Sequence, residues 1–348
     1  MPGDLPFTSA TELASAIRAK EVSPVDVLQT YLERVDRFDP VLNAFVFRDD
    51  DRALADARAA ADRLANESID DLPPLFGVPV PIKDLEDVAG WPTTLGSFAA
   101  ADDPRPTDSF AVARLRAAGA VLMGKTTTPE FGTVSFTESD RLGVTRNPWN
   151  PEHTPGGSSG GAAAAVASGM APIAHGSDGA GSIRIPSSCC NLVGLKPGRH
   201  RVTQEFESMA GGVTSGVLAR TVADAALGLD VLAVRDPYGW NMAPPLERSF
   251  REEATMDPGR LRVRMSIPSP LGLPVEPTVE AATRRLADQL AALGHEVTED
   301  EPRWPDVGEV YEAFLVMWST GAATFDLANP DRVEPHDRDP VNGATAID

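Results

Sequence analysis

A segment rich in glycine and serine dominates the middle of this sequence. Eight glycines fall within the twenty-six residues from Gly156 to Gly181, and Ser158 and Ser182 lie in the glycine-rich stretches at its two ends. Glycine loses more conformational entropy on folding than any other residue, so this density indicates backbone that adopts positive φ or lets another group approach closely. A helix over residues 162–168 and a strand over residues 172–175 are predicted between the two serines. The segment is therefore the first candidate for a reactive site.

The order of the predicted elements is typical of an α/β protein. Amphipathic helical spacing covers residues 9–36 and 51–66, and a short buried strand is predicted over residues 76–82. Helices and strands then alternate along the chain and end in a β-α-β passage after Pro258. This order predicts a mostly parallel or mixed β-sheet.

The composition excludes several classes of protein. The chain has 348 residues, of which 42% are hydrophobic, enough for a sizeable core in one large domain or two smaller ones. The net charge of −20 argues against nucleic acid or an anionic membrane as a partner, because such partners are bound mainly by Lys and Arg. No segment has the pattern of a membrane span or a signal peptide. The adjacent Cys189 and Cys190 cannot form a disulfide framework, and no metal-ligand spacing is found. We expect a cytoplasmic protein.

One motif match suggests a phosphate-binding loop and is rejected on its context. Residues 119–126, GAVLMGKT, fit the pattern GxxxxGK[ST]. The residues between the glycines should form a loop, yet they are themselves an apolar strand, and Thr127-Thr128-Pro129 is a poor start for the helix that must follow. We interpret this match as a strand that ends in a turn.

A second match, GxSxG at residues 156–160, suggests the nucleophile elbow of the α/β-hydrolases. An elbow needs a strand directly before it, and here three prolines lie between residues 148 and 155. The elbow would also need a downstream histidine as its base. None of the four candidates carries a local signature: His175, His200, His295 and His336.

A third pattern combines one lysine with the two serines. A serine hydroxyl cannot attack an amide unaided, and a lysine can take its proton only when the amine is neutral. Lys83 follows the apolar residues 80–82, and full burial there would lower its pKa by up to ~3–5 units. One serine could then relay the proton between Lys83 and the attacking serine. On the residues alone, a solvated Lys83 paired with Asp84 or Glu86 stays an alternative.

Five segments of the chain resemble the amidase signature family of serine amidohydrolases. They are GVPVPIKDLEDVAGWPTTLGS, GAVLMGKTTTPEFG, TRNPWNPEHTPGGSSGGAAAAVASG, GSDGAGSIRIPSSCCNLVGLKPGRHRV and LARTVADAALGLDVLA. The resemblance covers about residues 5–320. It implies a mixed β-sheet flanked by helices on both faces, in a single domain over residues 1–330 that lacks the family's C-terminal region. Residues 331–348 show no periodicity and are expected to form a disordered tail.

The resemblance also implies roles for individual residues. Lys83 would be the base, Ser158 the relay after a cis Gly157–Ser158 peptide bond, and Ser182 the nucleophile. An oxyanion hole is implied at the backbone N–H groups of Gly179, Ala180, Gly181 and Ser182. The supporting residues implied are Ser159, Asp178 and Arg184. No metal or organic cofactor is implied.

The implied reaction is hydrolysis of the carbon–nitrogen bond of a small carboxamide, arylamide, peptide amide or lactam through an acyl-enzyme. The Ser-Cys-Cys after the nucleophile loop resembles cyclic-amide and aryl-amide hydrolases. An inactive remnant that retains only a binding cleft is one alternative. A glutamine-hydrolysing amidotransferase subunit is another, which the sequence of residues 185–190 disfavours. The expected partner is a small amide, and a homo-oligomer stays open.

Overall fold

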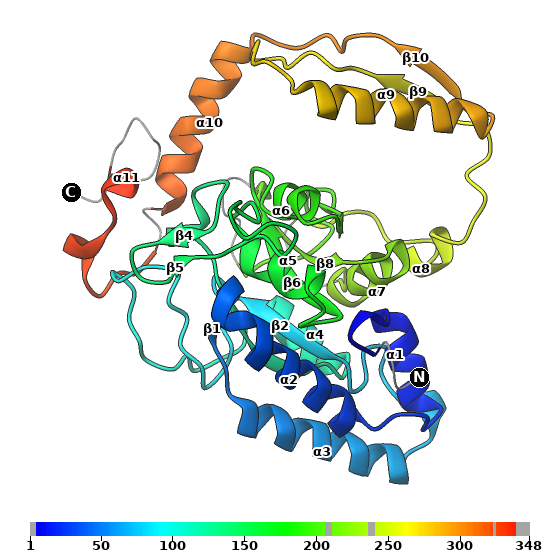
Figure 1. Ribbon diagram of the computed structural model, residues 1–348, viewed down its shortest axis with the longest axis vertical. Coiled ribbons are helices and arrows are strands. Elements are labelled where there is room, and N and C mark those ends of the chain that lie inside the picture. Colours follow the sequence, from blue (N-terminus) through cyan, green and yellow to red (C-terminus); the bar gives the residue numbers. More distant parts are fainter. Residues whose placement is uncertain (1–4, 206–210, 236–240, 323–324, 339–348) are drawn as a thin grey trace. The chain divides into compact units, whose positions relative to one another are not determined.

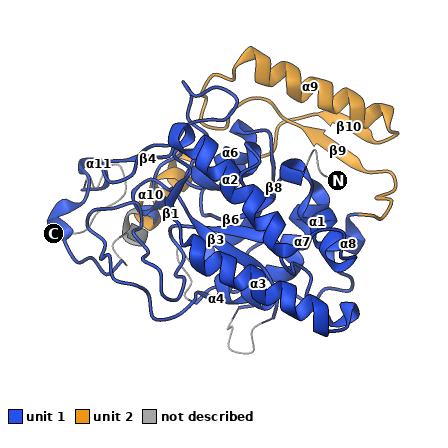
Figure 2. Cartoon of the chain, turned by 60° about the horizontal axis from the view of Figure 1, so that its bottom comes forward, with its two compact units in different colours: residues 1–254, 318–348 blue, residues 255–317 orange. Residues whose placement is uncertain are grey.

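The computed structural model describes residues 5–205, 211–235, 241–322 and 325–338 (Figure 1). The chain divides into two compact units (Figure 2). Unit 1 comprises residues 1–254 and 318–348, and unit 2 comprises residues 255–317. The single domain over residues 1–330 that the resemblance implies stays a prediction.

Three helices near the N-terminus follow the predicted periodicity. Helix α1, Ala10–Arg18, begins at Ser9, whose side chain accepts a hydrogen bond from the backbone N–H of Glu12 while the Glu12 carboxylate accepts from Ser9. This is a capping box, which satisfies two N–H groups that the helix itself cannot bond. Helices α2, Pro24–Leu42, and α3, Asp50–Asn66, lie side by side (Figure 1).

The first sheet has the strand order β1-β3-β2. Strands β2, Pro79–Lys83, and β3, Val121–Thr126, are parallel, whereas β1, Phe45–Phe47, is antiparallel to β3. Every residue of β2 and β3 is buried, so both strands are nearly continuous in apolar residues. The GxxxxGK[ST] match is therefore a buried strand, as interpreted. Helix α4, Phe110–Ala117, precedes β3.

The second sheet has the strand order β6-β8-β7 and is antiparallel. Its strands are β6, Ile173–Asp178, β7, Val193–Gly194, and β8, Thr214–Ala219. Strand β6 lies beside β2 of the first sheet. It runs to Asp178, three residues beyond the predicted end at His175. This longer strand brings two further polar residues of the motif to its end.

Three further helices, α5, α6 and α7, accompany these strands along the chain. Helix α5, Gly160–Ala167, consists of glycine, alanine and one valine, and only its last residue is less than fully buried. Helices α6, Arg184–Cys189, and α7, Val222–Leu232, follow β6 and β8 along the chain. The remaining elements of this part are η1 Leu5–Phe7, η2 Ile69–Asp71, η3 Glu130–Gly132, β4 Glu138–Ser139, β5 Gly143–Val144 and α8 Phe250–Glu253.

Unit 2 contains the predicted β-α-β passage. Strands β9, Arg262–Met265, and β10, Glu296–Glu299, are parallel, and helix α9, Pro277–Ala292, connects them. None of residues 255–317 is buried, in contrast to the strands of unit 1. Helix α10 spans Val307–Ala322.

The end of the chain is more ordered than the sequence predicted. Element α11, Pro335–Arg338, lies within residues 331–348, which were expected to be disordered, and η5, Pro330–Arg332, overlaps the start of this segment. Val333 is buried in a small apolar cluster with Leu95 and Phe131. Elements as short as these have no periodic pattern, so they cannot be predicted from hydrophobic spacing. The expectation for residues 339–348 falls outside the described residues.

Candidate active site

Two of the predicted catalytic residues meet between the sheets. Lys83 ends β2, and Ser158 lies just before α5. The Lys83 Nζ donates hydrogen bonds to Ser158 Oγ at 2.7 Å and to Ser177 Oγ at 3.3 Å. The peptide bond between Gly157 and Ser158 is cis, as the resemblance implied. The fold thus connects a lysine to a serine 75 positions further along the chain.

The environment of Lys83 favours a neutral amine. The side chain is fully buried, and this burial lowers its pKa to about 7, although the carboxylates of Asp178 and Glu86 oppose the shift. Asp84 does not pair with Lys83, because it forms an ion pair of 2.9 Å with Lys125. The alternative of a solvated Lys83 is therefore wrong. A large fraction of this amine can act as a base near neutral pH.

The loop after β6 carries Ser182, which is 8% exposed. The carbonyl of Ser182 accepts a hydrogen bond from the backbone N–H of Ser159 at 3.2 Å, so the two serine loops are joined directly. The Ser159 hydroxyl in turn donates to the carbonyl of Ser177 at 3.2 Å. Ser159 therefore links the loop of Ser158, the loop of Ser182 and the end of β6.

Asp178 holds the Ser182 loop through hydrogen bonds to its backbone and to Arg184. Its carboxylate accepts backbone hydrogen bonds from Gly181 at 2.8 Å and Ile183 at 3.0 Å, and two side-chain hydrogen bonds from Arg184 at 3.0 and 2.8 Å. Burial alone would raise the pKa of Asp178, but these hydrogen bonds hold it below its ordinary value. Asp178 and Arg184 thus hold the Ser182 turn through these hydrogen bonds.

The same contacts correct one member of the expected oxyanion hole. The N–H of Gly181 donates to Asp178, so it is not directed at a substrate. Among the described residues, the N–H groups of Gly179, Ala180 and Ser182 have no acceptor. Ala180 does not adopt positive φ, whereas Gly181 has a φ of 129°, and a Cβ there would lie 2.7 Å from Ile185 Cδ1. Positive φ is needed at Gly181 and not at Ala180, so an alanine at position 180 is compatible with the turn.

Two residues in contact with Lys83 and Ser158, Ser177 and Gly132, were not among the predicted site residues. Ser177 accepts a hydrogen bond from Lys83. It lies in β6, but the predicted strand ended at His175, so Ser177 was not predicted to lie beside β2. Gly132 lies against Ser158, since a Cβ on Gly132 would be 3.0 Å from Ser158 Oγ. The signal for Gly132 was present in the quoted motif, which ends in Pro-Glu-Phe-Gly.

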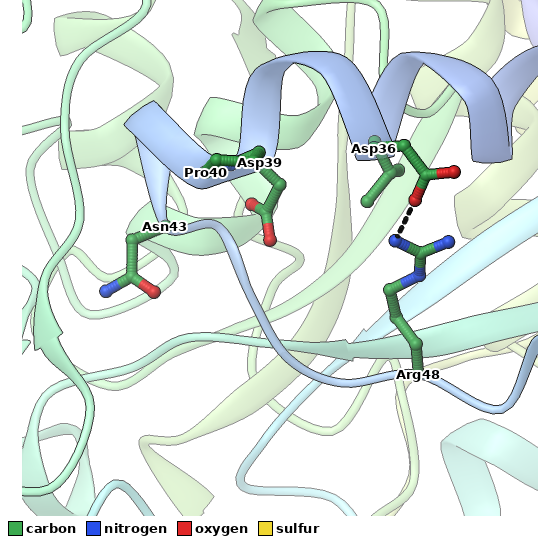
Figure 3. Close-up of a pocket in the computed structure, with 6 residues that line it drawn as sticks. Asp36, Asp39, Pro40, Asn43 and Arg48 are labelled. Atoms are coloured by element: carbon green, nitrogen blue, oxygen red, sulfur yellow. Dashed lines mark hydrogen bonds and ion pairs between the residues drawn. The ribbon is translucent and has the colours of Figure 1, made fainter.

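A pocket at the C-terminal end of α2 contains none of the predicted site residues (Figure 3). Asp36 in this pocket pairs with Arg48 at 2.6 Å, and Asp39 accepts the backbone N–H of Ala44 at 2.6 Å. Asn43 donates to the carbonyl of Leu142 at 2.7 Å. These contacts close the end of the helix, so the polar groups here are structural. The pocket is lined by Val35, Asp36, Asp39, Pro40, Asn43 and Arg48.

Two other kinds of feature, a metal site and a membrane-spanning helix, are absent from the part of the chain that the structure describes. No group of three or more His, Cys, Asp or Glu side chains there is arranged to hold a metal ion. No helix there has the length and apolar character needed to cross a membrane. Both cysteines are free thiols, with Cys189 exposed and Cys190 buried.

A family model described as Amidase matches residues 26–342. The chain belongs to the amidase family. It is 43% identical over 345 residues to AmiB2 of Mycobacterium tuberculosis, an alignment that covers 97% of this chain and 71% of that protein. The chemistry that characterises this family is hydrolysis of a carbon–nitrogen amide bond.

Solved structures of the same family share the fold. A 6-aminohexanoate cyclic dimer hydrolase complexed with substrate is 33% identical, with a TM-score of 0.85 over 94% of this chain and 70% of that one. A bacterial aryl acylamidase of the amidase signature family is 30% identical, with a TM-score of 0.84 over 91% of this chain and 65% of that one. The α/β fold with mixed sheets and surrounding helices is confirmed. The chain spans about two thirds of the length of these relatives.

Proposed function

We propose that this amidase acts through a serine triad in which Ser182 is the nucleophile, Ser158 the relay and Lys83 the general base. The observation that carries the proposal is the hydrogen bond of 2.7 Å between Ser158 and a lysine that is fully buried. Burial keeps much of the lysine neutral near pH 7, as a general base requires. The direct bond between the loops of Ser158 and Ser182 supports proton transfer from one serine to the other.

The proposed reaction begins with attack of Ser182 Oγ on the amide carbonyl. The Ser182 proton passes to Ser158, and the Ser158 proton passes to Lys83. The N–H groups of Gly179, Ala180 and Ser182 are the candidate donors to the oxyanion, and one such donor is worth ~3–4 kcal/mol in the transition state. Lys83 then returns the proton through Ser158 to the leaving amine, and water hydrolyses the acyl-enzyme.

The proposed substrate is a small carboxamide, arylamide, peptide amide or lactam. The names of two similar proteins support this range, since one is a cyclic dimer hydrolase and the other an aryl acylamidase. A cytoplasmic location is part of the same proposal. It is supported by the two free thiols, which are typical of a reducing compartment.

A fluorophosphonate probe tests the proposal directly. We expect it to label Ser182 covalently, and peptide mass spectrometry locates the adduct. Ser182→Ala should abolish both labelling and turnover of an amide panel, because triad members act as a unit. Ser188→Ala, an exposed serine of the same motif, is the matched control and should label normally. Labelling of a Ser182→Ala variant, or an adduct at another residue of the wild type, would contradict the proposal.

A further inference from the structure

The amine of Lys83 has two hydrogen-bond partners among the described residues, and both are serine hydroxyls. Its Nζ lies 2.7 Å from Ser158 Oγ and 3.3 Å from Ser177 Oγ. All three residues are buried, so neither hydroxyl is readily replaced by water. The proposed triad uses Ser158 and gives no role to Ser177. The second hydroxyl is thus a direct contact of the base that the proposed function leaves without a purpose.

Strand β6 holds Ser177 against this amine. Ser177 lies opposite Ser215 of the antiparallel strand β8, and its carbonyl accepts a hydrogen bond from the Ser159 hydroxyl at 3.2 Å. Side chains of successive strand residues point to opposite faces, so Ser177 faces Lys83 while the neighbouring Gly176 faces Ser159. A Cβ on Gly176 would lie 3.0 Å from Ser159 Oγ. Regular strand backbone, and not a loop, therefore presents the Ser177 hydroxyl.

Both protonation states of the amine use this second hydroxyl. A neutral amine has two N–H groups and one lone pair, and the lone pair must face the Ser158 hydroxyl when Lys83 acts as a base. An N–H donated to Ser177 fixes the rotation about the Cε–Nζ bond and so directs the lone pair. The ammonium has three N–H groups, and without Ser177 it would keep a single partner. Hydrogen bonds from a charged donor are the stronger ones, so Ser177 also favours the protonated state.

We infer that Ser177 is a positioning residue whose hydroxyl directs the lone pair of Lys83 toward Ser158 and then stabilises the ammonium that forms there. The inference rests on the proposed function. Ser177 neither gives nor receives a proton in the transfer from Ser182 through Ser158 to Lys83. It acts on the reaction only through the lysine.

Removing this hydroxyl should change the pH dependence of the reaction. In Ser177→Ala the ammonium of Lys83 loses one of its two partners, which lowers the pKa of the amine. The rising limb of Ser182 labelling should move to lower pH by roughly one unit, as for loss of a hydrogen bond to a charged group. The plateau rate should fall roughly 10-fold, because the base is weaker and its lone pair is no longer directed. KM for an amide should stay near its wild-type value, since the hydroxyl acts on the base and not on the substrate.

Two further variants separate this role from packing. Ser177→Thr keeps a hydroxyl on a residue type that suits a strand, and it should return the limb to its wild-type position. Ser187→Ala removes another buried serine hydroxyl, one that has no hydrogen-bond partner, and it should leave the limb in place. Helix α5 has no titratable side chain. The titratable groups around Lys83 that all three variants retain are Asp84 and Glu86 after β2, Lys125 on β3, and His175 and Asp178 on β6.

The experiment measures the rate of fluorophosphonate labelling at Ser182 against pH in the full chain, together with kcat and KM for an amide. Denaturant unfolding at the same pH values reports the lysine independently of Ser182. A lower folded pKa widens the pH range in which the unfolded chain binds more protons, so the rise of the unfolding free energy with pH should begin earlier in Ser177→Ala. An unmoved limb in a folded Ser177→Ala variant, an equal shift in Ser187→Ala, or a Ser177→Thr limb that stays with that of Ser177→Ala would overturn the inference.

Should Ser177→Ala not fold, Ser177→Cys decides, because its sulfur is a weak acceptor in a side chain of similar shape. A smaller shift in the same direction supports the inference, and no shift contradicts it. Coincident unfolding profiles of Ser177→Ala and the wild type in a labelled enzyme would contradict the inference alone. An unlabelled wild-type Ser182, with the earlier rise still present in Ser177→Ala, would instead contradict the proposed function and leave the contact between Ser177 and the charged lysine in place.

Discussion

Unit 1 buries titratable groups in two regions, one built around a base and one around acids. The basic region is the centre of Lys83 and Ser158 described above. The acidic region joins η3 to the end of the chain: Glu130 accepts the backbone N–H of Glu334 at 2.8 Å, and Thr133 donates to Asp337 at 2.7 Å. Glu130 and Asp337 are fully or almost fully buried.

Burial favours the neutral form of the titratable groups in both regions, which means loss of a proton for the lysine and gain of a proton for the acids. Burial lowers the pKa of Lys83 and raises the pKa of both Glu130 and Asp337, whose carboxyl groups also interact with each other. Asp337 Oδ2 accepts no hydrogen bond, which is unfavourable for a buried carboxylate. We expect Glu130 and Asp337 to share a proton, which relieves this cost. The difference lies in the hydrogen-bond partners. Lys83 donates to the hydroxyl of Ser158, which can exchange a proton with it, whereas Glu130 accepts from a backbone N–H and Asp337 accepts from the hydroxyl of Thr133.

The largest effect is expected when the amine of the basic region is removed. Lys83→Met fills the same buried space without an amine, so it should reduce labelling and turnover by ~10³-fold or more at every pH, as for loss of any triad member. The thermal melt should stay cooperative. Lys20→Met, at an exposed lysine, is the control and should leave the rate unchanged. A Lys83→Met rate within tenfold of the wild type would remove this residue from the role of base.

Lys83→Met should also change the pH dependence of stability. The folded pKa of about 7 lies below the ordinary value of 10.5, so the unfolded chain binds more protons between these two values. The unfolding free energy of the wild type should therefore gain a rising contribution from about pH 7 to pH 10.5. Denaturant unfolding at several pH values measures it. In Lys83→Met this rise should be smaller, and an unchanged slope would show that the lysine is not desolvated.

A second, smaller effect is expected at the residue that connects the two regions. Gly132 ends the same short helix as Glu130 and has a φ of 73°, and an added Cβ would lie 2.7 Å from Leu85 Cδ1 and 3.0 Å from Ser158 Oγ. Gly132→Ala should cost ~1–2 kcal/mol in backbone conformation alone. It should also displace Ser158 and lower the labelling rate by roughly 10-fold to 100-fold.

Stopped-flow labelling and a denaturant melt separate the two consequences of Gly132→Ala. Gly259→Ala offers a matched control, because that glycine also has positive φ, 64°, but a Cβ there meets nothing within 4 Å. The control should lose stability without losing rate. Equal labelling rates in both variants would mean that Gly132 does not constrain Ser158.

The two regions also differ in how far the sequence could predict them. Lys83, Ser158 and Ser182 stand in local motifs, and the strand predicted before Lys83 is enough to explain its burial. Ser177 was not predicted to lie in a strand, because the last three residues of β6 are glycine, serine and aspartate and so lack the apolar pattern that predicts a strand. The donation of Gly181 to Asp178 depends on the exact course of one turn, which composition does not specify.

The acidic region could not be predicted, because its members are distant in the sequence. Glu130 and Glu334 are 204 positions apart, and the later residue belongs to a stretch without periodicity. No local pattern reports which buried carboxyls will face each other after the chain has folded. The stacking of Phe131 on Phe325, with ring centroids 5.3 Å apart, is equally non-local. Long-range packing of short elements, not a propensity, holds this end of the chain on unit 1.

The smallest expected effect concerns this acidic region and has the opposite sign to that of the lysine. The folded pKa values of Glu130 and Asp337 are raised, so the folded chain binds more protons than the unfolded chain from about pH 4 up to neutrality. Their contribution to the unfolding free energy is complete below about pH 4 and is lost as the pH rises toward neutrality.

Asp337→Asn supplies a permanent N–H donor toward Glu130 and removes one of the two charges. At pH 8 the variant should be more stable than the wild type by about 1–2 kcal/mol, since one unit of pKa shift corresponds to ~1.4 kcal/mol. Asp331→Asn, at an exposed position in the same segment, should have no such effect. Melting temperatures between pH 4 and pH 8 decide the matter: if Asp337→Asn and the wild type lose stability in parallel over this range, the two acids do not share a proton, and the contrast with Lys83 fails.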